Sequence, residues 1–107
     1  MYKMGITPSK PSNNDLDHLS NIKTQCQENR NNRIFLINLL KTEWSNVVKK
    51  WNDGKLSRFD LNVTTHIIGT INDYDLNPIY TKLITKWNHG ASTGSDYDEV
   101  TYYIEKM

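Results

Sequence analysis

Apolar residues recur every three or four positions over residues 33–51, and this spacing predicts the longest helix of the chain. Leucine, isoleucine, valine and tryptophan occupy one face of the helical wheel, while lysine and asparagine mostly occupy the other. This arrangement is typical of an amphipathic helix that packs against a core. Asn52-Asp53-Gly54 predicts the end of the helix, because glycine accepts the left-handed conformation that often follows a helix.

Weaker patterns on either side of this segment predict a first and a third helix. The first follows a cap at Asn13 or Asn14, whose side chains can accept from the N–H groups of a first turn. The third begins with a capping box of Ser57 and Asp60. Because β-branched residues are dense over residues 60–71, a short strand stays open there as the alternative to a helix.

Two more helices are predicted in the last third of the chain. Asn77 followed by Pro78 predicts the start of the fourth helix, since proline has no N–H group to leave unpaired in a first turn. Ser95 or Asp96 predicts the start of the last one. The expected core comprises the apolar residues of these helices: Leu36, Ile37, Leu40, Trp44, Val47, Val48, Ile67, Ile68, Leu83, Ile84, Trp87 and Ile104.

The combined pattern predicts an all-α protein, a compact bundle of four to five helices with a flexible N-terminal arm. Residues 1–13 hold two prolines among serine, lysine and asparagine, a composition typical of an exposed arm. Residues 14–107 are predicted to form a single helical domain, because a chain of 107 residues can bury one core of modest size.

Composition limits which partners and which cellular location are expected for this domain. The formal net charge is +1, so no overall field draws the molecule onto nucleic acid or an anionic membrane. No apolar run approaches the roughly 18 residues needed to cross a bilayer. Residues 1–13 lack the apolar segment of a signal peptide, and the single cysteine, Cys26, cannot form an internal disulfide. These features predict a cytoplasmic protein with no membrane association.

The sequence contains no recognisable catalytic or metal-binding motif. The three histidines, His18, His66 and His89, lie far apart, whereas zinc needs three or four converging nitrogen or sulfur ligands. No glycine-rich phosphate loop, dinucleotide fingerprint or nucleophile elbow occurs. The sequence therefore predicts a protein that is not an enzyme and that uses no metal and no cofactor.

The segment from residue 79 to residue 104 resembles a signature of the YugE-like family, small uncharacterised helical proteins of low-GC bacteria. The sequence departs from that signature at Asn88-His89, where the family tends to Asp-Pro. The resemblance covers about a quarter of the chain, and it implies an all-α fold with no established activity. The residues in comparable places are Trp87, Gly94, Asp96, Tyr97, Asp98 and Glu99.

A protein-binding role is the preferred hypothesis for this small, nearly neutral domain. One alanine against thirteen asparagines and ten lysines indicates AT-rich coding, as in a low-GC bacterium, its phage or a mobile element. We therefore expect a cytoplasmic immunity or antitoxin protein, or a phage-encoded inhibitor, whose partner is another protein. The residues expected to contact that partner are Trp87, His89, Asp96, Tyr97, Asp98 and Glu99.

Two alternatives belong to other functional classes. The first is a nucleic-acid-binding regulator, whose affinity would fall steeply with salt. The second is an enzyme built on His89, Asp96 and Asp98, which requires these side chains to converge in one pocket. The lysines on which the first alternative depends are Lys41, Lys49, Lys50 and Lys55.

Overall fold

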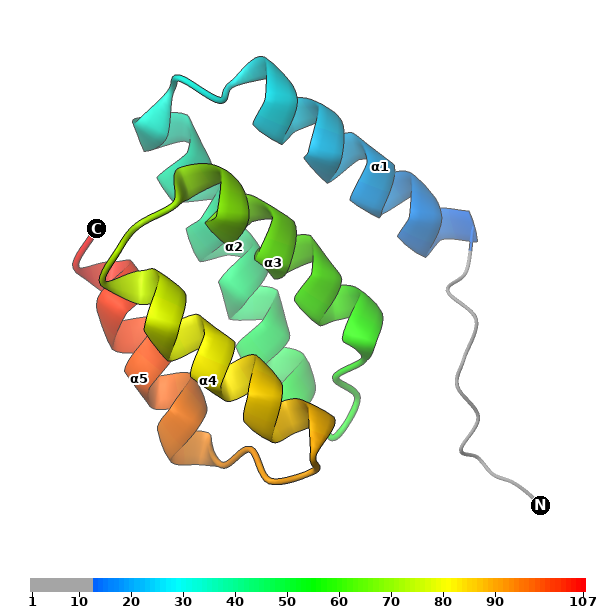
Figure 1. The fold of residues 1–107 in the computed structure, drawn as a ribbon. Coiled ribbons are helices and arrows are strands. Elements are labelled where there is room, and N and C mark those ends of the chain that lie inside the picture. Colours follow the sequence, from blue (N-terminus) through cyan, green and yellow to red (C-terminus); the bar gives the residue numbers. More distant parts are fainter. Residues whose placement is uncertain (1–12) are drawn as a thin grey trace.

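The computed structural model describes residues 13–107, and over that range it contains five α-helices and no strand (Figure 1). The predicted all-α class is thereby confirmed. The arm predicted over residues 1–13 lies outside the described residues, apart from Asn13, which begins the first helix. The helices are α1 (Asn13–Glu28), α2 (Arg33–Asn52), α3 (Arg58–Ile71), α4 (Leu76–Asn88) and α5 (Gly94–Glu105).

Four of the helices form a closed ring. Each of α2, α3, α4 and α5 packs against the next in the chain, and α5 packs back against α2 (Figure 1). Short connections make consecutive helices antiparallel, as in an up-and-down bundle. Helix α1 lies outside the ring, mainly against α3. The seam between α2 and α5 therefore joins helices that are far apart in sequence.

Helix α3 begins with the predicted capping box. Ser57 Oγ accepts from the N–H of Asp60 at 3.3 Å, and Asp60 Oδ2 accepts from the N–H of Ser57 at 3.0 Å. The strand alternative over residues 60–71 is wrong, because their buried side chains repeat at helical spacing and pack on α1 and α2. Gly54, at φ +72°, follows the end of α2 as predicted.

The first turns of α4 and α5 differ from their predictions. Helix α4 begins at Leu76, so Asn77 lies inside the helix and does not cap it. Asp73 takes the capping role instead, because its Oδ1 accepts from the N–H groups of residues 75 and 76, both at 2.9 Å. Helix α5 begins at Gly94, one residue before the predicted range, and Thr93 precedes it.

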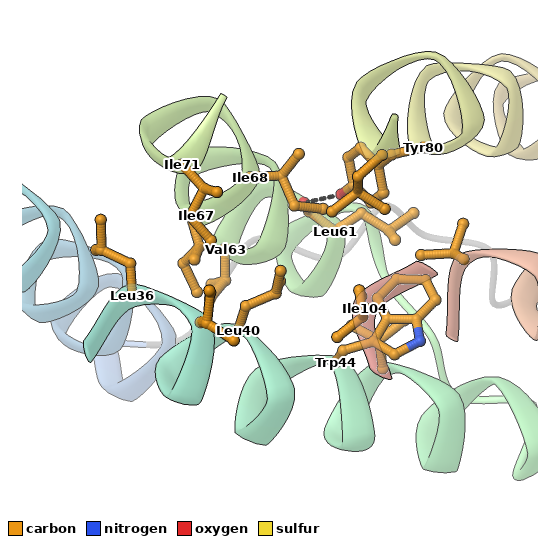
Figure 2. Packing of buried hydrophobic residues seen from close by; sticks show 14 of the residues in the cluster. Leu36, Leu40, Trp44, Leu61, Val63, Ile67, Ile68, Ile71, Tyr80 and Ile104 are labelled. Atoms are coloured by element: carbon orange, nitrogen blue, oxygen red, sulfur yellow. Dashed lines mark hydrogen bonds between the residues drawn. The ribbon is translucent and has the colours of Figure 1, made fainter. Parts of the chain in front are cut away.

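The core lies inside the ring and continues under α1 (Figure 2). Of the predicted core residues, Val48, Ile84 and Trp87 are only partly buried, and the others are buried. Helix α1 contributes Ile22 and Cys26, each 1% exposed. Buried residues outside the predicted set are Ile22, Cys26, Leu61, Val63, Thr64, Ile71, Leu76, Tyr80, Asp96, Tyr97 and Val100.

Trp44 joins three helices at the centre of the ring. Its indole Nε1 donates to Thr101 Oγ1 of α5 at 2.8 Å, so the buried N–H group is satisfied. Its ring meets Tyr80 of α4 edge to face and stacks with Tyr97 of α5, both with centroids 6.2 Å apart. The predicted core role of Trp44 is confirmed, with the addition of a polar link across the α2–α5 seam.

Candidate protein-binding surfaces

The predicted partner-binding residues surround the connection between α4 and α5. Trp87 is half-buried, and the guanidinium of Arg58 lies 5.6 Å from the centroid of its ring. His89 is exposed at the end of α4, where its Nδ1 donates to the carbonyl oxygen of Thr85 at 2.8 Å. Of these two side chains, His89 presents more free surface to a partner.

Asp96 and Tyr97 are buried and serve the interior. Asp96 Oδ2 accepts from the N–H of Thr93 at 2.8 Å, and its Oδ1 lies 3.0 Å from Lys86 Nζ. The Thr93 N–H, followed by the Lys86 ammonium, holds the pKa of the Asp96 carboxyl below its ordinary value. Tyr97 packs on Trp51 with ring centroids 4.6 Å apart. Both residues thus stabilise the start of α5.

Asp98 and Glu99 lie on different sides of α5. Glu99 Oε1 lies 3.9 Å from Lys82 Nζ of α4, and Asp98 is exposed beside α2. Asp96 and Asp98 are two residues apart and diverge by about 200° around the helix axis. The structure therefore does not bring the Asp96 and Asp98 carboxylates together with His89 in the way that the enzyme alternative requires.

The predicted nucleic-acid lysines do not form one basic face. Lys50 Nζ lies 2.7 Å from Asp60 Oδ1 of α3, which neutralises it locally. Lys55 is exposed in the connection after α2. Lys41 and Lys49 line a groove that also contains acidic side chains. Phosphate groups that approached these lysines would meet carboxylates as well.

That groove lies between α2 and α5 and has a volume of about 500 Å³. Trp44, Val48 and Ile104 supply its apolar lining. Its polar lining differs between the two walls, with lysines on α2 and acids on α5. The wall residues are Lys41, Ser45, Lys49 and Asn52 on α2 and Asp98, Thr101 and Glu105 on α5.

The two most exposed large apolar side chains, those of Ile34 and Tyr74, belong to segments at the opposite end of the bundle from the α4–α5 connection. Ile34 is 75% exposed in the first turn of α2, and Tyr74 is 85% exposed between α3 and α4. The residues before them form an ion pair, with Arg33 Nη2 2.9 Å from Asp73 Oδ2. This pair joins the start of α2 to the α3–α4 connection, and both segments lie near the C-terminus (Figure 1).

A hollow of about 300 Å³ opens at the same end. Its lining combines two cations, two carboxylates and two larger side chains from the last turn of the chain. We call this hollow, together with Ile34 and Tyr74, the tyrosine end. The lining residues are Arg33, Asp73, Asp75, Tyr103, Lys106 and Met107.

A smaller hollow of about 120 Å³ lies between α1, α2 and α3. His18 Nε2 lies 3.0 Å from Glu43 Oε1, and Lys50 pairs with Asp60 on its other side. These pairs brace α1 and α3 against α2. Within residues 13–107, no three His, Cys, Asp or Glu side chains are placed to hold a metal ion. No helix there has the length and apolar character to cross a membrane.

Comparisons with known proteins add no relative. No family model, no curated protein and no solved structure matches this chain. The resemblance of residues 79–104 to the YugE-like family therefore stays a prediction.

The sequence analysis missed the tyrosine end. Ile34 falls on the polar face of α2, and Tyr74 lies in a loop between acids. Neither position is expected to be buried, so the core does not require a large apolar side chain there. An apolar side chain at a position where a polar one is expected was the only indication in the sequence. Only the fold shows that the two positions lie at the same end of the molecule.

Proposed function

We propose that the protein acts by binding another protein through the tyrosine end. The observation that supports this most is the exposure of Ile34 (75%) and Tyr74 (85%) beside the Arg33–Asp73 ion pair. Exposed apolar side chains that gather in one place are typical of interaction sites, and tyrosine is enriched among residues that dominate binding energy. An aliphatic and an aromatic anchor on a braced backbone fit this pattern.

The surroundings of these anchors resemble the rim of a protein interface. Arg33 and Lys106 offer cations, and Asp73 and Asp75 offer carboxylates, so a partner can form charged hydrogen bonds around an apolar centre. The N–H of Leu76 is the main reason that the pKa of the Asp73 carboxyl lies below its ordinary value, and Arg33 adds to this effect. The brace between α2 and the α3–α4 connection therefore stays charged at neutral pH.

The role we propose is that of a cytoplasmic immunity, antitoxin or phage-encoded inhibitor protein, which blocks a target by covering it. A chain of 107 residues with a net charge of +1 can perform such blocking without catalytic groups. The nucleic-acid alternative has less support, because Lys50 is paired with Asp60 and because Lys41 and Lys49 face a groove with an acidic wall.

Photo-crosslinking in the source cell tests this function. We expect Tyr74→p-benzoylphenylalanine to give one dominant light-dependent adduct, and the same probe at the exposed position Asn62 of α3 to give none. Ile34→Asp should remove the adduct, because a charge in an interface centre costs about 2 kcal/mol or more, roughly thirtyfold in Kd. Asn38→Asp, one turn further along α2, adds the same charge outside the tyrosine end and should leave the adduct intact.

Two results would count against the proposal. One is the same set of adducts from positions 74 and 62, which would indicate random collisions. The other is an adduct that survives Ile34→Asp while the variant stays folded by circular dichroism.

A further inference from the structure

The groove between α2 and α5 has charged walls without partners. The side chains of Lys41 and Lys49 on α2, and of Asp98 and Glu105 on α5, make no hydrogen bond and no ion pair with any residue in the range 13–107. By contrast, the carboxylates of Asp60, Asp96 and Glu99 each lie within 4 Å of a lysine Nζ. The groove thus presents unpaired positive charge on one side and unpaired negative charge on the other.

Each of these two lysines on α2 also lies at nearly the same position along the groove axis as an acid on α5. Helices α2 and α5 are antiparallel, and the hydrogen bond between Trp44 and Thr101 shows which residues are level. Lys41 lies three residues before Trp44, and Glu105 lies four residues after Thr101. Both residues are therefore at the same end of the groove. Lys49 and Asp98 lie toward the other end, within about 3 Å of each other along the axis, at 1.5 Å per residue.

We propose that a second copy of this chain occupies the groove, related to the first by a two-fold axis that runs along it. Rotation by 180° about that axis places α2 of each copy opposite α5 of the other and preserves height. Lys41 then meets Glu105 of the partner subunit, and Lys49 meets Asp98 of the partner subunit. Each pair forms twice, as in the self-complementary interfaces of symmetric dimers.

Apolar contacts fit the same arrangement. Tyr102 is 58% exposed on α5, on the same side of the helix as Asp98 and Glu105. It is nearly level with Ser45 of α2, whose small side chain leaves room above Trp44 and Val48. In the dimer, Tyr102 of each copy covers Ser45 of the partner subunit, and the apolar lining of both grooves leaves water.

Charge complementarity favours this occupant over others. A phosphate backbone would meet the carboxylates of Asp98 and Glu105 as well as the lysines. An unrelated helix would need acids along one edge and bases along the other, at the heights that this chain already supplies. The inference does not rest on the proposed function, because the groove and the hollow at the tyrosine end share no lining residue, although Tyr102 contacts Tyr103 and Lys106 of that end.

Complementary charge reversals test the dimer by sedimentation equilibrium. We expect the wild type to be a dimer, and K41E/K49E (both walls acidic) and D98K/E105K (both walls basic) each to raise the dimer dissociation constant at least tenfold. Mixed in equal amounts, the two variants should form a heterodimer. The variant that carries all four substitutions should be a dimer again, because its walls are merely exchanged.

Matched controls separate the groove from general charge effects. K23E/K55E and D17K/E28K change the same charges at exposed positions outside the groove and should leave the wild-type dissociation constant unchanged. A wild type that is monomeric at millimolar concentration overturns the inference, and so does a mixture of the two variants that stays monomeric. Circular dichroism of each variant confirms its fold. None of these outcomes affects the crosslinks from position 74, so this inference and the proposed function fail separately.

Discussion

The hydroxyl of Tyr80 is buried and has three polar neighbours within hydrogen-bond distance. It contacts Thr64 Oγ1 at 2.7 Å and Thr65 Oγ1 at 2.8 Å, and it lies 2.9 Å from the carbonyl oxygen of Leu61. These contacts tie α4 to α3 (Figure 2). Burial raises the pKa of Tyr80 to about 12, because an ionised phenol would lose its hydration inside the bundle.

This shift predicts a loss of stability in alkali. Above pH 10 the unfolded chain releases the Tyr80 proton while the folded chain retains it, so the free energy of unfolding falls as pH rises from about 10 toward 12. Urea unfolding at several pH values measures the slope. Tyr80→Phe, which cannot ionise, should reduce that slope although it lowers stability at pH 7. An unchanged slope would show that another group controls the transition.

The Asp96 carboxylate leads to the opposite pH dependence. Its folded pKa is lowered by the Thr93 N–H and then by Lys86, so its contribution to stability is present above the ordinary carboxyl range and is lost as pH falls below about 4. Asp96→Asn should cost about 1 kcal/mol at pH 7, a magnitude typical of a helix cap. Asp17→Asn, at an exposed position of α1, is the matched control. The difference between the Asp96 variant and wild type should shrink in acid; a constant difference would exclude the charged state as its cause.

At the scale of the helix, two glycines predict opposite effects of the same change. Gly69 lies in the last turn of α3 with open space where a Cβ would stand, so Gly69→Ala should raise the free energy of unfolding by about 0.5–1 kcal/mol. Gly54 also has space, but its φ of +72° strains any other residue, so Gly54→Ala should lower stability by about 1 kcal/mol. Thermal unfolding compares the two. A gain at position 54 would contradict the assignment of the left-handed end of α2.

How well the sequence predicted each helix depended on how many local signals agreed. In α2, periodicity and a terminal glycine coincide, and the predicted span is confirmed to within one residue. In α4, Asn77-Pro78 suggested a cap, but Asp73 supplies it from three residues before Leu76, at the point where α3 and α4 turn. Leu76 is fully buried and begins the helix, so Asn77 lies within the first turn and Asp73 is placed to accept from its N–H groups.

The predicted binding residues show a different kind of limit. Acids near a helix start are equally consistent with capping and with binding, and only burial distinguishes the two. Asp96 proved to be a buried cap, whereas Asp98 reached an exposed wall two residues later. The two surfaces that carry the proposals form between segments distant in sequence, such as Ile34 with Tyr74, so no local pattern could reveal them.

At the scale of the whole molecule, α1 is the helix that packs outside the four-helix ring and is held by few buried residues. It packs outside the ring, with Ile22 and Cys26 as its buried residues and the His18–Glu43 pair as a link to α2. Hydrogen exchange should therefore show protection in α1 lower than in α2 by on the order of tenfold or more, because α1 can open while the ring stays closed. Ile22→Ala should widen the gap. Equal protection in α1 and α2 would mean that all five helices unfold as one unit.

Closure of the ring has a consequence for the folding reaction. Pairs α2–α3, α3–α4 and α4–α5 join neighbours along the chain, so they can form early at little cost in loop entropy. The α2–α5 seam brings together residues more than fifty apart, such as Trp44 and Thr101, and it has the highest contact order in the ring. We expect seam contacts to be weakly formed in the transition state, so that weakening them mainly accelerates unfolding. The lifetime of the native state is then controlled at the same seam that forms the floor of the groove.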